Sequence, residues 1–407
     1  MPRLNLCGSL KLHLLFYKSQ LAWPPRCGGT VHTGNLMKAL VARGAAVTLV
    51  TEQPVDDEAT QWLAGVKVQP IRTNATSETE TRSWPKRRLA NYWGFQHSHS
   101  EWIKQFVQRE NADVMVAVGL ETLPYLDSID SSSPIKRIWY PADDPTLHAY
   151  SLMGQNGFSF RQVKQMAINI AYQRAFCNSV DAAWVVSSRD QKWMRRTVGF
   201  RSVDVIANGV DSNYYRPIDE PTEPHSCIFW GRLDFSPNVH ALEYFLSEVW
   251  PTVRRESPSA QFHVCGAHPT TEIRDLLKKS AGAHFHENLD DLRPRITASA
   301  VAVFPMVSGA GVKNKVLEAA AMAKPVLASK ICLGGLSCEE PPPFKLLSTP
   351  QEWASALFAL WSDSSKITQA GQAAREWVMR HHSWDQAALA AIRSLEALPG
   401  HPQLAAT

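Results

Sequence analysis

The sequence lacks the features that would place the chain outside the cell or across a membrane. Its seven cysteines are odd in number, scattered, and include no Cys-x-x-Cys pair. We therefore expect a reducing compartment, no disulfide framework and no zinc site. No run of about 18 apolar residues occurs, so no segment is predicted to span a bilayer. The amino-terminal region has no proper apolar segment, so no signal peptide is predicted. Together these absences predict a cytoplasmic protein.

The chain also lacks a strong excess of charge of one sign. Its 42 Lys and Arg side chains nearly balance 38 Asp and Glu, which gives a formal charge of +4 and a pI near 8.6. A dedicated nucleic-acid binder is expected to have a pI above about 9 and clustered cations. We therefore expect no nucleic-acid partner. Weak attraction to an anionic membrane surface is compatible with this balance.

The first half of the chain alternates between apolar runs typical of buried strands and segments with helical spacing. Gly44 follows one such helical segment, where a glycine commonly ends a helix. A polar stretch over 73–88 has almost no aliphatic residues and is predicted to be a mobile loop. The expected strands are 12–17, 47–51, 113–119, 136–140 and 182–187, and the expected helices are 33–43 and 160–176.

The same alternation restarts in the second half. The expected strands are 227–230, 261–265, 301–304 and 325–328, and the expected helices are 239–249, 271–279, 312–322 and 383–398. Strand–helix alternation of this kind builds parallel sheets. The predicted fold is therefore α/β, with two doubly wound Rossmann-like domains, 1–207 and 208–382, facing each other across a cleft. The segment 383–407 is expected to hold a final helix that packs back on the first domain. Ligands of such sheets bind outside the carboxyl ends of the strands.

The segment from Phe304 to Pro325 carries the strongest functional signal. A buried strand ends at Phe304, a loop of small residues follows, and an Ala-rich helix begins near Val312. Gly309 and Gly311 would let the backbone approach a ligand closely. Free amides at a helix start favour an anion such as a diphosphate. Gly-x-Gly alone would also fit an ordinary surface turn before a core helix.

Lys313 and Lys315 lie at the start of this helix, and Glu318 lies about a turn further along. A lysine at a helix start opposes the helix dipole, so its position there favours a bound anion. The Glu318 carboxylate could accept hydrogen bonds from ribose hydroxyls. The ordered string of strand, Gly-x-Gly, Lys and Leu-Glu-Ala therefore predicts a nucleotide-like ligand.

This string resembles the donor-site signature of the family-four retaining glycosyltransferases, which have the two-domain GT-B architecture. The matching helix reads Lys315-Val316-Leu317-Glu318-Ala319 and is followed by Lys324-Pro325-Val326. The resemblance extends to Gly231-Arg232-Leu233 after a strand, to the linker-like segment 208–217, and to Gly28-Gly29 in the expected first loop of the amino-terminal domain. It covers most of the chain from 12 to 390, and its carboxy-terminal motifs are the more specific ones.

The resemblance implies a role for each matching position. Arg232 and Lys315 would contact the donor diphosphate, with a guanidinium fork suited to two phosphate oxygens. Glu318 would bind the ribose. His286 and Glu287, at a strand end, would line the nucleobase pocket, and no metal is expected because helix dipole and cations offset the leaving charge. Further diphosphate contacts would come from the backbone of Gly309, Ala310, Gly311 and Val312 and from Gly28 and Gly29.

The chain departs from the family pattern at three places. Ala310 replaces the first glutamate of the family's paired-glutamate motif, which contacts the transferred sugar. Pro237 stands where the family often has a second lysine, so Lys313 or Lys315 would compensate. Where the family commonly has a histidine or an acid facing the donor sugar, this chain has no histidine, and Asp143 and Asp144 occupy that region; we predict them as the catalytic residues. An Asx turn before Pro145 explains this acidic pair about as well.

The predicted function is transfer of a sugar from a nucleoside diphosphate sugar to an acceptor hydroxyl, with retention, in the synthesis of glycan, polysaccharide or glycolipid. The sugar nucleotide is a substrate and no cofactor is expected. The acceptor is a glycan, a lipid-linked molecule or a small molecule. Basic residues around Trp84 within 81–88 could contact a membrane interface, at the inner face. A sugar-nucleotide epimerase or hydrolase, or a non-catalytic binding protein, are the alternatives.

Overall fold

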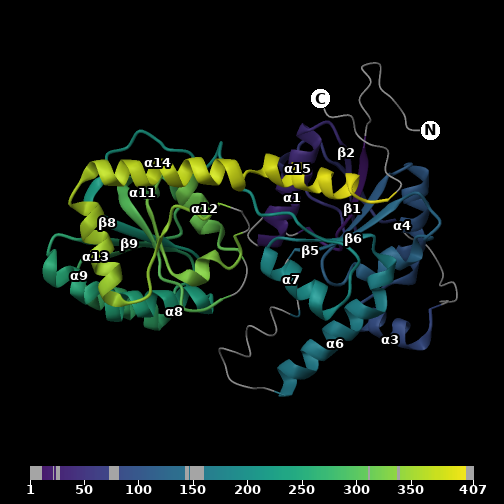
Figure 1. Cartoon of the computed structure of the whole chain (residues 1–407), viewed down its shortest axis with the longest axis horizontal. Coiled ribbons are helices and arrows are strands. Elements are labelled where there is room, and N and C mark those ends of the chain that lie inside the picture. Colours follow the sequence, from purple (N-terminus) through teal and green to yellow (C-terminus); the bar gives the residue numbers. More distant parts are fainter. Residues whose placement is uncertain are drawn as a thin grey trace. The chain divides into compact units, whose positions relative to one another are not determined.

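The structure is a computed structural model of the chain, and it describes residues 12–21, 23, 28–72, 82–142, 146, 160–309, 312–336 and 340–399. The chain forms two compact units (Figure 1). The first comprises Met1–Ala207 with Trp384–Thr407, and the second comprises Asn208–Ser383. Each unit is built on its own parallel sheet with helices on both faces, so the predicted pair of Rossmann-like α/β domains is confirmed.

The first unit contains a seven-stranded sheet in the order β3-β2-β1-β4-β5-β6-β7. All of its strand pairs are parallel, and the central strands are buried on both faces, as expected for apolar runs of this kind. The order reverses between β1 and β4, so the carboxyl ends of these two strands form a topological switch point. The strands are β1 (His13–Tyr17), β2 (Ala46–Thr51), β3 (Lys67–Pro70), β4 (Val114–Val118), β5 (Lys136–Ala142), β6 (Ala182–Val185) and β7 (Val203–Val205).

Two groups of helices cover the two faces of this sheet. On one face, α1 (Gly28–Ala42) packs against α15 (Trp384–Glu396), and the Trp184 indole of β6 donates to Ser394 of α15 at 2.9 Å. On the other face, Tyr172, Phe176 and Met194 join a single apolar core with β1, β4 and β6. This second face is covered by α3 (Trp84–Tyr92), α4 (His97–Arg109), α6 (Phe160–Phe176) and α7 (Ser188–Thr197).

The second unit contains a six-stranded parallel sheet in the order β10-β9-β8-β11-β12-β13. Its strands are β8 (Glu223–Trp230), β9 (Gln261–Gly266), β10 (Ala283–Glu287), β11 (Ser299–Phe304), β12 (Val326–Ala328) and β13 (Lys345–Leu346). Its helices are α8 (Ser236–Tyr244), continued by a π turn and α9 (Trp250–Glu256), then α10 (Thr271–Lys279), α11 (Arg293–Ala298), α12 (Asn314–Ala321), α13 (Pro350–Trp361) and α14 (Ser364–His381). The central strands β8 and β11 point their carboxyl ends toward the loop before α12.

Three expectations about local structure need correction. Gly28 and Gly29 lie in the first turn of α1, not in a loop, and Thr33 Oγ1 donates to Gly29 O at 2.8 Å across that turn. The prediction of a loop over 73–88 is wrong at its end, because a helix begins at Trp84. Pro85 lies in the first turn of this helix, where a backbone N–H would have no partner within the helix, so proline's lack of one costs nothing. Residues 73–81 lie outside the described residues. The expected helix over 239–249 is an α-helix only to Tyr244.

Within the described part of the chain, no helix combines the length and the apolar character needed to cross a bilayer.

Candidate functional site

Gly231 directly follows the central strand β8 and forms the turn at the centre of the candidate site. Its φ is +149°, which favours glycine, and its amide donates to Cys265 O on β9 at 3.1 Å. A Cβ at this position would lie 2.7 Å from Asn238 Nδ2 and 2.9 Å from Lys315 Nζ. The ends of two polar side chains therefore lie within 3 Å of the place that a Cβ would occupy, and any other residue at this turn would have to displace them.

Lys315 points from the first turn of α12 into this turn. Its Nζ donates to Asn238 Oδ1 at 2.7 Å and lies 4.3 Å from the centre of the Phe229 ring. Asn238 Nδ2 in turn donates to the carbonyl of Arg232 at 2.8 Å, which fixes the amide orientation. Burial lowers the pKa of Lys315 to about 7. About half of the Lys315 side chains would be neutral near pH 7, and because a nearby anion favours the charged form, anion binding here would be coupled to protonation of Lys315.

Glu318 lies one turn after Lys315 on the same helix. Its carboxylate accepts from the Trp230 indole at 2.9 Å and from the Tyr215 hydroxyl. Burial raises the pKa of Glu318, while the nearby Lys315 acts to lower it. The structure thus brings the predicted diphosphate cation and the predicted ribose carboxylate to one helix turn beside the end of β8.

Arg232 is paired within its own loop. Its guanidinium makes two bonds to the Asp234 carboxylate, at 3.0 and 2.6 Å, and its side chain is 65% exposed. This pairing raises the pKa of Arg232 and lowers that of Asp234. An anion at the Gly231 turn would have to compete with Asp234 for this guanidinium.

The loop before α12 approaches the same place from β11. Gly309 has a φ of +101°, and a Cβ there would lie 3.1 Å from both Lys313 Nζ and Pro237. Ser308 Oγ lies 3.2 Å from Nδ1 of His240 on α8. Val312 is described, whereas Ala310 and Gly311 lie outside the described residues. Lys313 is a second cation at this loop. Its Nζ lies near Pro237, the residue that stands where the family often has a lysine.

The contacts of His286 and Glu287 do not connect these residues to the Gly231 turn. Both lie on β10, the edge strand two positions from β8. Nε2 of His286 lies 3.1 Å from Nδ1 of the buried His263, and the Glu287 carboxylate pairs with Arg274 of α10 at 2.6 Å. Their predicted place in a nucleobase pocket stays a prediction.

In the first unit, the carboxyl ends of the strands carry a second set of polar groups. At the switch point, Ser19 after β1 donates to Glu121 after β4 at 2.6 Å. Beside it, the Tyr17 hydroxyl donates to Glu52, which follows β2, at 2.8 Å. The sequence patterns did not indicate these residues, because each lies alone after a different strand.

His32 of α1 is buried in the first unit. Its ring bonds to the hydroxyl of Tyr140 at the end of β5, and burial lowers its pKa to about 3. Its ring also meets Trp384 edge-on, with centroids 5.1 Å apart. Asp143 and Asp144 follow β5 directly and lie outside the described residues. The neutral His32 therefore serves the packing of α1, β5 and α15.

Comparison with known proteins gives two family matches that together cover most of the chain. Residues 27–214 match the model described as Glycosyltransferase Family 4, and residues 224–363 match the model described as Glycosyl transferases group 1. Comparison with curated protein sequences gives no match. The expected family is therefore confirmed by the two domain models.

The fold is similar to that of solved glycosyltransferase structures. Sucrose-phosphate synthase from Thermosynechococcus elongatus matches with a TM-score of 0.66 at 16% identity, over 95% of this chain and 98% of the other. HepE from Anabaena, solved in complex with UDP, matches with 0.64 at 13% identity, over 96% and 100%. A glycosyltransferase from Rickettsia africae matches with 0.64 at 12% identity, over 96% and 100%. At these identities the likeness shows the fold alone. On its two domain matches, the chain belongs to the glycosyltransferases of group 1, family four, with the GT-B fold.

Proposed function

We propose that the protein transfers a sugar from a nucleoside diphosphate sugar to an acceptor hydroxyl with retention of configuration. In this reaction the bond between the anomeric carbon and the diphosphate breaks, and the diphosphate leaves with the electron pair. A bond from the anomeric carbon to the acceptor oxygen forms, and the acceptor proton passes to a base. The chain acts without a metal in this proposal, in the cytoplasm, in the synthesis of a glycan, polysaccharide or glycolipid.

The half-buried Lys315 beside Gly231 carries this proposal. Its ammonium group is fixed by Asn238 at 2.7 Å, so it is already in place when negative charge develops on the leaving diphosphate. Fixed charge of this kind stabilises a transition state without reorganisation. Lys313 and Arg232 would add positive charge from the flanking loops. Glu318 would accept hydrogen bonds from the ribose hydroxyls in place of those that it now accepts from Trp230 and Tyr215.

For the acceptor side, the proposal uses the carboxylates at the switch point of the first unit. Glu121 and Glu52 are half-buried, and each accepts from a neighbouring hydroxyl, from Ser19 and Tyr17 respectively. Carboxylates in this setting can accept from the hydroxyls of a sugar acceptor. Asp143 and Asp144 are kept as the groups that contact the donor sugar or take the acceptor proton.

The test is a panel of radiolabelled nucleoside diphosphate sugars, beginning with UDP-glucose because one structure of Anabaena HepE holds that donor. Release of UDP together with a labelled acceptor supports the proposal, and an axial product linkage from an α-configured donor supports retention. Release of free labelled sugar in the presence of acceptors would indicate a hydrolase. Tight UDP binding without turnover across donors and acceptors would indicate a binding protein.

Gly231→Ala is expected to weaken UDP binding about tenfold or more, equal to about 1.4 kcal/mol. The new methyl would displace Asn238 or Lys315, whose polar atoms lie within 2.9 Å of its position. The strained φ adds about 1–3 kcal/mol to the loss of stability. Titration calorimetry with UDP and urea unfolding measure the two effects.

Gly44→Ala is the matched control for backbone strain. Gly44 also has a positive φ, +87°, but a Cβ there meets nothing within 4 Å. This variant should lose stability and keep the UDP affinity of the wild type. Equal loss of UDP affinity in both variants would show that the Gly231 turn is not the diphosphate site.

A further inference from the structure

Three helices of the first unit carry charged residues of almost only one sign. The proposed transfer reaction does not use these residues. Helices α3, α6 and α7 carry three, three and four Lys or Arg residues, and Asp190 is their only acidic residue. Asp190 is buried and bonded to Ser187 at the start of α7. The chain as a whole has nearly equal numbers of basic and acidic residues, so this surface concentrates positive charge.

Several of these ten cations serve the fold. Lys86 pairs with Asp127 at 2.9 Å, Arg174 donates to Thr197 O at 2.7 Å, and Arg195 donates to Val203 O at 2.9 Å. The other seven are exposed, and we call them the basic face. They are Arg87, Arg88, Arg161, Lys164, Arg189, Lys192 and Arg196.

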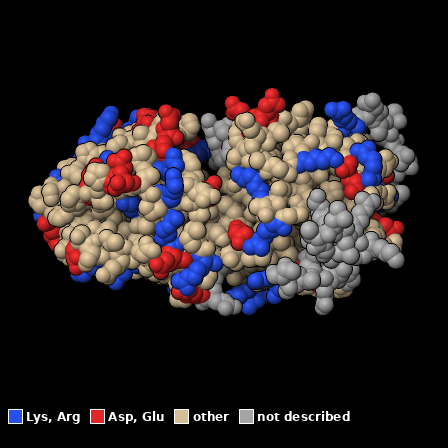
Figure 2. Space-filling model, turned by 90° about the horizontal axis from the view of Figure 1, so that it is seen from above, with Lys and Arg blue, Asp and Glu red and all other residues tan. Residues whose placement is uncertain are grey.

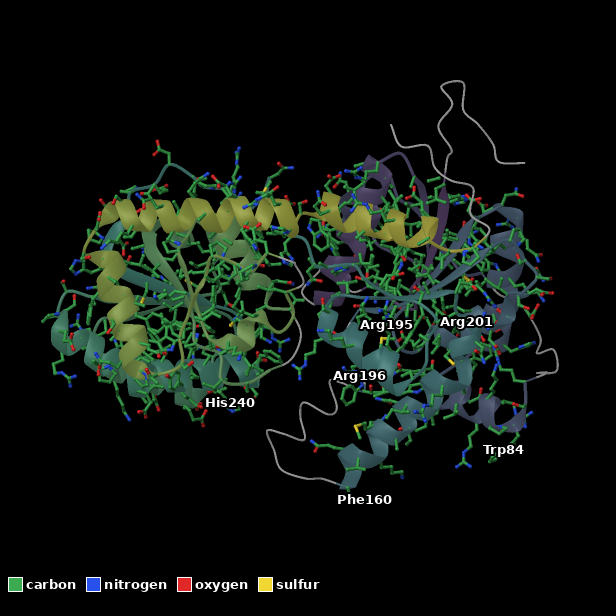
Figure 3. The ribbon with its side chains drawn as sticks, viewed as in Figure 1. Trp84, Phe160, Arg195, Arg196, Arg201 and His240 are labelled. Carbon is green, nitrogen blue, oxygen red and sulfur yellow. The ribbon has the colours of Figure 1, made fainter. Side chains whose placement is uncertain are left out.

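The three helices lie on the same side of the first unit's sheet. The side chains of Tyr172 and Phe176 on α6 and Met194 on α7 enter one apolar core, and α3 packs directly against α6. Figure 3 labels Arg196 on α7, Phe160 at the start of α6 and Trp84 at the start of α3. In contrast, the view in Figure 2 shows acidic and basic side chains interspersed. A surface with one sign of charge creates a field that a mixed surface does not.

Exposed aromatic side chains stand at the ends of two of these helices. Phe160, the first residue of α6, is 84% exposed, and Trp84, the first residue of α3, is 62% exposed. They are the two most exposed large apolar side chains in the described part of the chain. Tyr92, the last residue of α3, is 55% exposed. Aromatic rings beside Lys and Arg side chains, as at these helix ends, are typical of protein segments that lie at a membrane–water interface.

We propose that α3, α6 and α7 form a docking face for an anionic lipid surface, with the basic face meeting the headgroups and Phe160 and Trp84 entering the interface. Positive charge alone would suit any polyanion, whereas exposed rings gain free energy only where they leave water. This combination favours a bilayer over a nucleic acid or an anionic polysaccharide. The inference rests on this surface alone and would stand if the donor assignment failed.

The test is cosedimentation of the full chain with vesicles of phosphatidylcholine and phosphatidylglycerol, compared with vesicles of phosphatidylcholine alone. We expect binding to the anionic vesicles, weakened by salt because exposed charges are screened. Each cation near an anionic surface contributes about a fivefold gain in affinity, so Lys192→Gln with Arg196→Gln should weaken binding roughly 25-fold. Phe160→Ser should weaken it several-fold even at low salt.

Matched controls lie in the second unit. Lys278 and Lys279 are exposed in the last turn of α10, and Leu346 on β13 is 43% exposed. Lys278→Gln with Lys279→Gln, and Leu346→Ser, should bind vesicles as the wild type does. All variants should keep the wild-type affinity for UDP, which separates this surface from the donor site.

Equal binding to both kinds of vesicle, or wild-type binding by the α7 and Phe160 variants, would overturn the proposal. Heparin provides the second arm. If heparin binds with the same dependence on Lys192 and Arg196, and Phe160→Ser leaves vesicle binding unchanged, the surface is a general polyanion site and the lipid assignment is wrong.

Discussion

Replacing Lys315 with methionine is expected to lower the rate of sugar transfer by about 10²–10³-fold, the usual effect of removing one fixed group that stabilises developing negative charge. Methionine has nearly the length of lysine and packs well against the Phe229 ring, which the Lys315 ammonium faces at 4.3 Å. The fold should therefore survive, although Asn238 Oδ1 loses its donor. Initial rates with a labelled sugar nucleotide measure the effect.

The pH dependence of UDP binding is an independent test of the role of Lys315. The pKa of Lys315 is about 7 without ligand, and a bound diphosphate favours the charged form. Affinity should therefore be nearly full below about pH 6, fall to about half by pH 7, and fall about fivefold further between pH 7 and pH 8, as the fraction of protonated lysine falls. Lys315→Met should lose this dependence.

Lys330→Met is the matched control, because Lys330 is an exposed lysine of the same unit. It should retain both the wild-type rate and the fall in UDP affinity above pH 7. Wild-type transfer by Lys315→Met, or a flat pH profile of UDP binding in the wild-type protein, would remove Lys315 from the diphosphate site.

The second large effect expected is loss of stability in mild acid. Burial lowers the pKa of three histidines, to about 3 for His32 and about 4 for both His263 and His382. Each is neutral in the folded chain, whereas in the unfolded chain it takes up a proton below pH 6.5. Their contribution to stability is therefore complete above pH 6.5 and is lost as the pH falls toward the folded-state values.

At pH 5 each of these histidines should cost about 2 kcal/mol, since each pH unit below 6.5 costs about 1.4 kcal/mol. Three such losses are comparable to the whole stability of a typical domain. His263 and His382 lie in the second unit and His32 in the first, so the second unit should lose more. Carboxylates such as Asp181, whose pKa is lowered by Arg137, weaken the fold only near pH 4 and below.

Urea unfolding followed by circular dichroism at pH 7 and pH 5 measures this loss. His263→Gln keeps a side chain that can hydrogen-bond but cannot titrate, so it should reduce the difference between the two pH values by about 2 kcal/mol. His97→Gln, in the partly exposed first turn of α4, should leave the difference unchanged. A wild-type protein equally stable at both pH values would contradict the prediction.

Local patterns predicted the regular elements well where one apolar run forms one buried element. Helices Phe160–Phe176 and Thr271–Lys279 were predicted with their bounds, and the central strands of both sheets within two or three residues except at the start of β8. No helix was predicted at α3, α4, α7, α13 or α14. Helix α3 has few apolar residues, whereas α4 buries Ile103, Phe106 and Val107 at a helical spacing that could have been recognised. Gly28 and Gly29 were misplaced because glycine pairs usually signal a loop, whereas here they begin a helix.

In the candidate site too, motifs of neighbouring residues were predicted, whereas contacts between residues far apart in the sequence were not. The Gly231 turn, Lys315 and Glu318 were predicted because each lies in a recognisable string of the sequence. That Asn238 fixes Lys315 could not be predicted, because the two residues are 77 positions apart and meet only when α8 and α12 pack beside β8. The pairing of Ser19 with Glu121 across the switch point is equally non-local.

The sequence by itself determined the family, the two parallel sheets and the loop before α12, because periodicity and short motifs are properties of neighbouring residues. Tertiary structure alone decided which charges meet. It placed Lys315 against Asn238 and Phe229, buried His32 against Tyr140, and gathered the cations of α3, α6 and α7 on one side of a sheet. The physical reason is that pKa values and surface fields depend on distance and burial in space, which spacing along a chain does not fix.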